Sequence, residues 1–167
     1  PVERAERLFP LSVDRHEFLP DTGGPGEHRG GLGMVRTMTF EGQTELGVET
    51  ARTKEGTPGV NGGEAGSLGR LYRNRGEVDE AVIGGYDDDG EWHRCIRSNE
   101  PFEPGDSFTM ETQGGGGWGR PEERDPEAVL EDVRDGKVTV EHAREAYGVV
   151  VVDGEVDEAA TAALRAE

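Results

Sequence analysis

The sequence predicts an α+β fold in which a β-rich, glycine-loop-rich domain precedes a short helical C-terminal tail. Residues 21–119 hold short segments of alternating polarity separated by Gly, Pro and Asp, a pattern typical of strands joined by tight turns. Residues 121–167 hold three helix starts instead. We therefore predict a domain at 1–120 and a tail at 121–167. The tail is expected to dock on the β-rich domain or on a partner, because helices this short are marginal alone.

The β-rich domain is expected to open with an extended entry at 1–20, where apolar and polar residues alternate between Pro10 and Pro20. The turn sequence DDDGE at 87–91 lacks the downstream Glu of a calcium loop and predicts a hairpin turn. Strand candidates follow at 34–40, 45–51, 67–72, 78–83, 92–96 and 107–112.

The tail is predicted from helix capping signals. Asp125 is a suitable N-cap with Pro126 in the first helical position, and Gly136 ends that helix. Val129, Leu130 and Val133 share one of its faces.

A second helix is predicted from Thr139 to about 147–148, and the run VVVV at 149–152 indicates a strand or a buried extended segment. Asp157 then caps a last helix with Ala160, Ala163 and Leu164 on one side.

The composition is strongly acidic, with 36 Asp and Glu against 18 Lys and Arg and a formal charge of −18. This balance argues against nucleic acid and anionic membranes as partners, since both require basic clusters. The acids could maintain a surface in a salt-rich cell or bind a basic partner. Because they are spread along the chain and lysine is nearly absent, we favour the halophilic interpretation.

The cysteine count and the lack of long apolar segments indicate the cellular location of the protein. Cys95 is the single cysteine, so neither an internal disulfide nor a cysteine-rich zinc site is expected. No apolar run has the length of a spanning helix and no signal-peptide pattern is present, so a cytoplasmic protein is expected. The first residue is not Met, and we expect a piece of a longer chain.

Common catalytic motifs are weak or missing. Neither lysine follows a glycine, so there is no Walker-type nucleotide loop. Ser67 in AGSLG lacks the strand-to-helix context of a hydrolase nucleophile. His93 and Cys95 are two ligands where a metal site needs more, and a strand face or a lone half-buried thiol explains them more simply.

The tetraglycine at 114–117 needs an explanation, because four glycines destabilise a fold unless their backbone conformation or bareness is required. One hypothesis is an anion-binding nest of N–H groups for a carboxylate, phosphate or oxyanion. The other is a tight crossing of backbones without a ligand.

In their order along the chain, the segments PVERAERLFPLSV, PDTGGPGEHRGGLGMVRTMTF, NGGEAG and PGDSFTMETQGGGGWGRPEERDPEAVLEDVRDGKVTVEHAREAYGVVV resemble the C-terminal part of the hydantoinase B/oxoprolinase family. The resemblance spans nearly the whole chain. It departs at 50–62, where Thr53 stands in place of a second arginine, and at DDDGEWHRCIRSN.

This resemblance implies a subunit of an ATP-dependent cyclic-amide hydrolase of the N-methylhydantoinase or 5-oxoprolinase type. ATP would activate a ring carbonyl, and water would then open the lactam or hydantoin. The implied partners are an A-type ATPase subunit of the actin-like superfamily and the upstream part of the same subunit. No cofactor is expected in this chain. ATP with magnesium is expected on the partner, and a metal is possible upstream. The alternatives are a subunit of an acetone- or acetophenone-type carboxylase and a non-catalytic docking module.

The candidate site residues serve substrate or oxyanion binding, while the catalytic residues are unknown. Hydantoins, 5-oxoproline and their products carry carbonyls or carboxylates, which suit bare N–H groups and guanidinium groups. We expect the two glycine loops to face one cleft, with Arg29 or Arg52 near it. The candidates are Asp21, Gly23, Gly24, Arg29, Gly30, Gly31, Arg52, Gly114, Gly115, Gly116 and Gly117.

Overall fold

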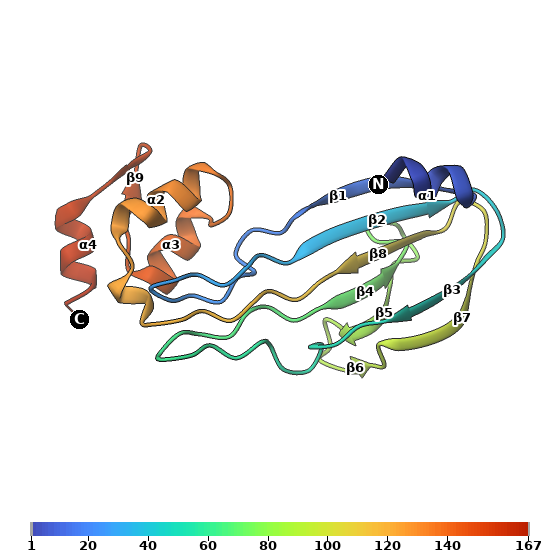
Figure 1. Ribbon diagram of the computed structural model, residues 1–167, viewed down its shortest axis with the longest axis horizontal. Coiled ribbons are helices and arrows are strands. Elements are labelled where there is room, and N and C mark those ends of the chain that lie inside the picture. Colours follow the sequence, from blue (N-terminus) through green and yellow to red (C-terminus); the bar gives the residue numbers. More distant parts are fainter. Residues whose placement is uncertain (1, 167) are drawn as a thin grey trace. The chain divides into compact units, whose positions relative to one another are not determined.

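The computed structural model describes residues 2–166 and confirms a mixed α+β fold, with 32% of residues in strands and 21% in helices (Figure 1). The chain forms two compact units. The strand unit comprises the residues up to Glu17, Met34–Glu55 and Leu68–Thr112. The glycine unit comprises Phe18–Gly33, Gly56–Ser67 and the residues from Gln113 onward. These contacts group the glycine loops with the helices that follow residue 120, whereas the predicted boundary at residue 120 would separate them.

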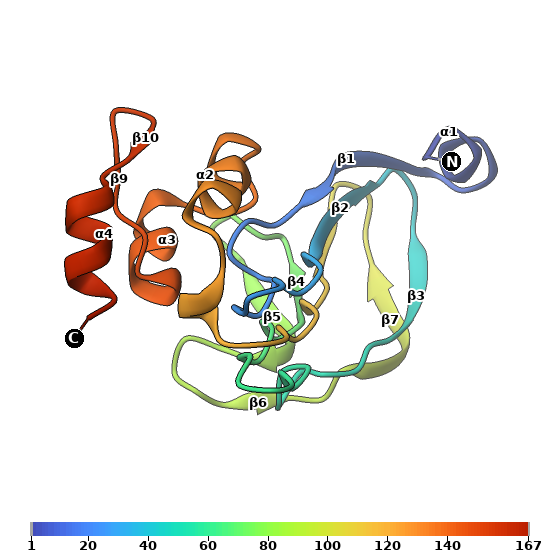
Figure 2. The same ribbon diagram turned by 60° about the vertical axis from the view of Figure 1, so that its left-hand side comes forward.

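The strand unit is built on a six-stranded sheet of order β1-β2-β8-β4-β5-β6 (Figure 1). The pairs β2–β8, β8–β4, β4–β5 and β5–β6 are antiparallel. A separate antiparallel ribbon joins β3 to β7 (Figure 2). The elements of this unit are helix α1 (Val2–Leu8) and strands β1 (Leu11–Phe18), β2 (Met34–Phe40), β3 (Thr44–Glu49), β4 (Arg70–Arg73), β5 (Ala81–Tyr86), β6 (Trp92–His93), β7 (Ile96–Phe102) and β8 (Ser107–Glu111).

The core of the strand unit is aromatic. The ring centroids of Phe40 and Phe102 lie 4.8 Å apart, and those of Phe102 and Phe108 lie 6.1 Å apart in an edge-on arrangement. Leu71 and Cys95 are buried in the same cluster. The thiol of Cys95 is thus more deeply buried than the half-buried thiol we expected.

Most predicted strands are present, but their ends differ. Strand β2 has the predicted bounds, while β3, β4, β5 and β8 differ by one to three residues at their ends. The candidate at 92–96 was wrong as one strand, because the chain leaves the sheet at 94–95 and continues as β7. The extended entry was wrong at its start, where α1 forms, although the alternating residues after Pro10 do form β1.

The hairpin turn at 87–91 is confirmed between β5 and β6. The Asp87 N–H donates to the Glu91 carbonyl at 3.0 Å, and Asp87 Oδ1 accepts from the N–H groups of Asp89 and Glu91. His93 Nε2 lies 2.7 Å from Asp87 Oδ2. This hydrogen bond, followed by the one from the Glu91 N–H, lowers the pKa of Asp87.

The helices of the glycine unit begin where the capping signals predict. Asp125 caps α2 (Pro126–Arg134), Thr139 caps α3 (Val140–Tyr147) and Asp157 caps α4 (Glu158–Leu164) through side-chain oxygens. Gly148 ends α3 in the left-handed conformation.

The rest of the glycine unit completes a small core. A short helix η1 (Pro121–Glu123) precedes α2, and a hairpin of β9 (Val151–Val152) and β10 (Glu155–Val156) precedes α4. Thus only the end of the VVVV run is a strand. The buried side chains of this core are Val129, Val138, Ala143, Tyr147 and Val149. In α4 the buried residue is Thr161, while Ala163 is exposed, so the predicted face is shifted.

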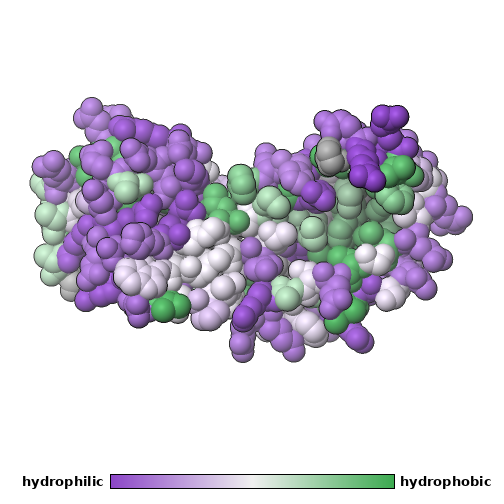
Figure 3. Space-filling model, viewed as in Figure 1, coloured by the Kyte–Doolittle hydropathy of each residue, from purple (hydrophilic) through white to green (hydrophobic). Residues whose placement is uncertain are grey.

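On the face shown in Figure 3, hydrophilic residues alternate with paler and hydrophobic areas. Within residues 2–166, no helix combines the length and the hydropathy needed to cross a membrane.

Candidate functional site

Three glycine-rich segments, at 22–33, 57–66 and 113–118, run side by side in the glycine unit without forming helices or sheet strands. Backbone hydrogen bonds join them. The Gly24 N–H donates to the Gly115 carbonyl and the Gly115 N–H donates to the Gly31 carbonyl, both at 2.8 Å. The Gly117 N–H donates to the Glu64 carbonyl at 2.9 Å. The tetraglycine is therefore hydrogen-bonded to both other segments.

Close backbone approach explains why these positions hold glycine. A Cβ atom on Gly30 or Gly66 would lie far inside 3.0 Å of carbonyl oxygens in the tetraglycine. One on Gly114 would collide with the Thr22 carbonyl, and one on Gly117 with the Pro25 carbonyl. Real Cβ atoms essentially never come so near. The tight backbone crossing alone therefore accounts for the tetraglycine.

The anion-nest hypothesis requires free N–H groups, and most of the run is already engaged. The Gly114 N–H lies 3.1 Å from Ser67 Oγ, while those of Gly115 and Gly117 donate to carbonyls. An anion at the run would have to displace these partners. The binding role of Gly114–Gly117 stays a prediction.

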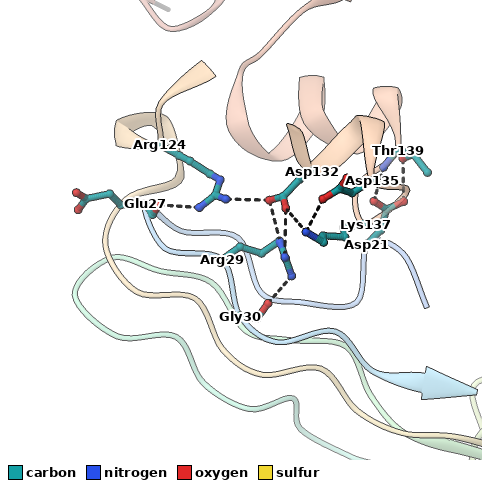
Figure 4. Close-up of polar contacts among 9 residues, drawn as sticks. All are labelled: Asp21, Glu27, Arg29, Gly30, Arg124, Asp132, Asp135, Lys137 and Thr139. Atoms are coloured by element: carbon teal, nitrogen blue, oxygen red, sulfur yellow. Dashed lines mark hydrogen bonds and ion pairs between the residues drawn. The ribbon is translucent and has the colours of Figure 1, made fainter. Parts of the chain in front are cut away.

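A buried ionic cluster centred on Asp132 joins the first glycine segment to α2 (Figure 4). Arg29 donates to Asp132 through Nε at 3.0 Å and Nη2 at 3.3 Å. Arg124 Nη2 donates to the same carboxylate at 2.8 Å, and Lys137 Nζ lies 3.8 Å from it. The Asp132 side chain is only 8% exposed. Removing this carboxylate would leave two largely buried guanidinium groups without an anionic partner.

Sequence reasoning did not single out Asp132. The carboxylate lies on the same helix as the apolar residues Val129, Leu130 and Val133, and its partner Arg29 is 103 residues away in sequence. The usable signal was the helical spacing, because Asp132 follows Val129 by three residues and so lies next to it on the helix surface.

Asp21 holds the start of α3. Its Oδ1 accepts from the Thr139 N–H at 2.7 Å and its Oδ2 accepts from the Thr139 hydroxyl at 2.8 Å (Figure 4). Asp21 has a φ of 61°, a left-handed conformation that Asp tolerates better than most residues. Both carboxylate oxygens of Asp21 are therefore engaged in hydrogen bonds that hold the start of α3.

The remaining candidates divide between the two units. Asp21, Arg29 and all eight candidate glycines lie in the glycine unit, where Gly24, Gly31 and Gly115 are hydrogen-bonded together. Arg52 belongs to the strand unit, at an open hollow that Thr53 and Trp92 also line. Thr53, which stands where the family pattern has a second arginine, accepts a hydrogen bond through Oγ1 from Trp92 Nε1 at 3.4 Å.

One hollow in the glycine unit brings several candidates to the surface. It has a volume of about 460 Å³ and lies beside the Asp132 cluster. Cations line it together with apolar side chains and open backbone: no atom lies within 4 Å of a Cβ built on Gly31. Its lining residues are Phe18, Arg29, Gly30, Gly31, Leu32, Asp135, Gly136 and Lys137.

Arg29 has N–H donors that no residue of the glycine unit occupies. A guanidinium has five N–H donors, and three hydrogen bonds to Asp132 and the Gly30 carbonyl are present, which leaves two. Lys137 is 41% exposed and pairs with Asp135 at 2.7 Å. The hollow therefore presents positive charge beside an apolar wall, a combination that suits a small molecule with a carbonyl or carboxylate. We take this hollow as the candidate functional site.

The other candidate catalytic features have structural partners. Ser67 Oγ accepts from the Gly114 N–H, so its position serves the glycine segments. Within residues 2–166, no group of three or more His, Cys, Asp or Glu side chains could hold a metal ion.

Tyr147 lies at the centre of the helical core with its ring fully buried. Burial raises its pKa to about 12, while the positive charges of Arg124 and Arg29 act in the opposite direction. The phenol is therefore neutral at physiological pH. Its hydroxyl has no hydrogen-bond partner among the described residues.

The sequence profile of the Hydantoinase B/oxoprolinase family matches residues 1–121, and the chain belongs to this family. The caprolactamase subunit beta of Pseudomonas jessenii is 33% identical over 99% of the chain and 28% of its own length.

Two solved structures share the fold. The crystal structure of the ATP-dependent caprolactamase of Pseudomonas jessenii matches with a TM-score of 0.77 and 30% identity, over 100% of this chain and 28% of that one. A nucleotide-free acetone carboxylase structure matches with a TM-score of 0.75 and 25% identity, over 99% of this chain and 26% of that one. The chain thus spans about a quarter of the length of these relatives.

Proposed function

We propose that this chain is the C-terminal part of a subunit of an ATP-dependent enzyme that opens the ring of a cyclic amide. The observation that carries the proposal is the match along the whole chain to the ATP-dependent caprolactamase. The family to which the chain belongs supports the same class of substrate.

The chemistry explains the need for ATP. An amide carbon resists attack by water because its nitrogen is a poor leaving group, so transfer of phosphate to the carbonyl oxygen makes attack easier. Water adds to the activated carbon, and the carbon–nitrogen bond breaks as the nitrogen takes up a proton, which leaves an acyl phosphate on the opened chain. A second water molecule then releases inorganic phosphate, and a carboxylate remains. We place ATP with magnesium on an A-type partner subunit, since this chain has no nucleotide loop.

Within this reaction we assign the hollow at Arg29 and Lys137 a binding role toward the carbonyl or the carboxylate. The two remaining donors of Arg29 and the exposed ammonium of Lys137 support it. The hollow and the glycine runs Gly23–Gly33 and Gly114–Gly117 hold no Ser, Thr or Cys, and no covalent role is assigned to them.

Acetone-type carboxylation is the second candidate, favoured by the match to acetone carboxylase with a TM-score of 0.75. The longer subunit should be produced together with its ATPase partner and supplied with hydantoin, 5-oxoproline, caprolactam, or acetone with bicarbonate. ADP release and mass spectrometry of the product are measured. Opening of any cyclic amide supports the proposal, whereas turnover of acetone alone would show that the enzyme is a carboxylase.

Two controls separate the role of the hollow from that of the assembly. The 167-residue chain alone should release no phosphate from ATP. In the active complex, Lys137→Ala should raise KM about tenfold through one lost charge-assisted hydrogen bond. Lys54→Ala removes the only other lysine, which lies over the Trp92 ring in the strand unit, and should leave KM unchanged. Equal KM values for both variants would exclude the binding role of the hollow.

A further inference from the structure

An aromatic and apolar patch lies on the surface of the glycine segments, outside the hollow. Trp118 has two bridge partners in the neighbouring segments, His28 in an antiparallel bridge and Val60 in a parallel one. Directly paired residues of neighbouring extended segments carry their side chains on the same face. The ring centroids of His28 and Trp118 lie 5.4 Å apart. The three side chains therefore form one surface, which we call the Trp118 patch.

The Trp118 patch is open to solvent in this chain. Trp118 is 45% exposed, Val60 is 55% exposed, and His28 is exposed as well. Neither hydrophobic core of the described residues includes any of the three side chains. A Trp side chain contributes to stability mainly through the large apolar area that it buries, and joined apolar groups at a surface mark places where another molecule or segment packs. The patch is therefore a candidate contact surface.

Backbone hydrogen bonds hold the patch in one conformation. The Trp118 N–H donates to the His28 carbonyl at 3.0 Å, and the His28 N–H donates to the Trp118 carbonyl at 2.9 Å. On the other side, the Val60 N–H donates to the Gly117 carbonyl at 2.9 Å and the Val60 carbonyl accepts from the Gly119 N–H at 3.0 Å. A surface that is already ordered loses little conformational entropy when it is covered.

The small size of the patch and the charge of the chain favour one kind of occupant. Two copies of a chain of charge −18 repel each other, which disfavours a second copy. A stable contact with a separate subunit needs about 800 Å² on each partner, far more than three partly exposed side chains supply. A segment of the same polypeptide needs less area, because its tether raises its effective concentration. The relatives have such segments, since this chain covers only 28% of the caprolactamase subunit beta.

We propose that the upstream part of the same subunit packs on the Trp118 patch and places apolar side chains against the indole and Val60. The inference rests on the proposed function, in which this chain is the C-terminal part of a longer subunit. Trp118 directly follows the tetraglycine in sequence. The contact therefore joins the glycine segments to the part of the subunit that precedes them.

Hydroxyl-radical oxidation of the longer subunit, measured by mass spectrometry of its peptides, tests the proposal directly. The oxidation rate of each residue in the native subunit is divided by its rate in the urea-denatured subunit. We expect this ratio for Trp118 to be as low as that for Phe102, which is 0% exposed. A ratio nearer to 45%, the exposed fraction of Trp118 in this chain, would overturn the proposal.

The same measurement identifies the occupant. Protection of Trp118 that appears only after the ATPase partner is added, or only at raised protein concentration, would assign the patch to that partner or to a second copy and overturn the proposal. The measurement needs no turnover. An exposed Trp118 in a subunit that opens cyclic amides would therefore refute this inference alone, whereas a protected Trp118 in an inactive subunit would support it and refute the proposed function.

A charge placed in the patch gives an independent test in the longer subunit. Val60→Lys should lower its thermal midpoint by about 5 °C, because a covered patch would bury an ammonium group without a partner. The control Val78→Lys changes a fully exposed residue of the strand unit and should shift the midpoint by less than about 1 °C. A shift for Val60→Lys that is no larger than that for Val78→Lys would contradict the proposal.

Discussion

Replacing Gly30 with alanine tests whether the glycine segments are held by close backbone contact. The added Cβ would collide with the Gly115 carbonyl and lie 2.9 Å from the Gly116 carbonyl oxygen. Both belong to backbone, so no side chain can rotate away. The tetraglycine would have to move by roughly 1 Å to restore an ordinary contact.

The expected cost follows from what that movement breaks. Overpacking of an interior typically costs about 1–3 kcal/mol. The hydrogen bond from Gly24 to the Gly115 carbonyl would be strained as well, which adds about 1 kcal/mol. We expect Gly30→Ala to lose about 2–4 kcal/mol of unfolding free energy, or about 5–15 °C in the thermal midpoint.

The neighbouring glycine is a matched control. No atom lies within 4 Å of a Cβ on Gly31, so Gly31→Ala should change stability by less than about 1 kcal/mol. The chain has two tryptophans, and a Trp92→Phe background leaves Trp118, beside the tetraglycine, as the sole fluorescent reporter. Urea unfolding then gives both free energies. If Gly30→Ala were as stable as Gly31→Ala, the close-contact explanation would be wrong.

Three further measurements address the charges. Asp132→Asn should lower the unfolding free energy by about 3–5 kcal/mol, because it leaves Arg29 and Arg124 without their shared carboxylate. The control Asp135→Asn changes a largely exposed carboxylate and should cost less than about 1 kcal/mol. Similar losses for the two variants in urea unfolding would contradict the buried cluster. Asp106 has a lowered pKa, first because the Glu103 N–H donates to it, so its contribution to stability is complete above about pH 4 and is lost as the pH falls below that value. Asp106→Asn should therefore flatten the acid limb of the stability profile, and an unchanged slope would exclude this role. Finally, the thermal midpoint should rise from dilute buffer to molar potassium chloride because like charges repel at low ionic strength; a flat or falling midpoint would remove the halophilic interpretation.

Local chemistry made the helix starts predictable. An N-cap needs only a side-chain oxygen and the next few N–H groups, so Asp125, Thr139 and Asp157 could be read directly from the sequence. Helix α1 was not predicted because its segment has no capping signal. The extended conformation indicated by the alternating residues after Pro10 was therefore assumed for the residues before it as well.

Long-range chemistry was not predictable in the same way. The sequence indicated that these positions require residues without a side chain. Because glycine has no side chain, its size or polarity cannot indicate which residue it contacts. The contact between Gly30 and Gly115 therefore appears only in the structure. The pairing of Arg29 with Asp132 depends on the same packing, because it joins residues from the first glycine segment and from α2.

The interleaving of the two units along the chain has a consequence for folding. Two segments of the glycine unit lie between the pieces of the strand unit and the third follows the last piece, so its backbone hydrogen bonds link residues that are far apart in sequence. During synthesis the first segment must wait until the tetraglycine has left the ribosome before Gly24 can meet Gly115. Closing such long loops before any contact forms slows folding. Until then the early glycine segments remain open to proteases, and a chain truncated before residue 113 would never protect them.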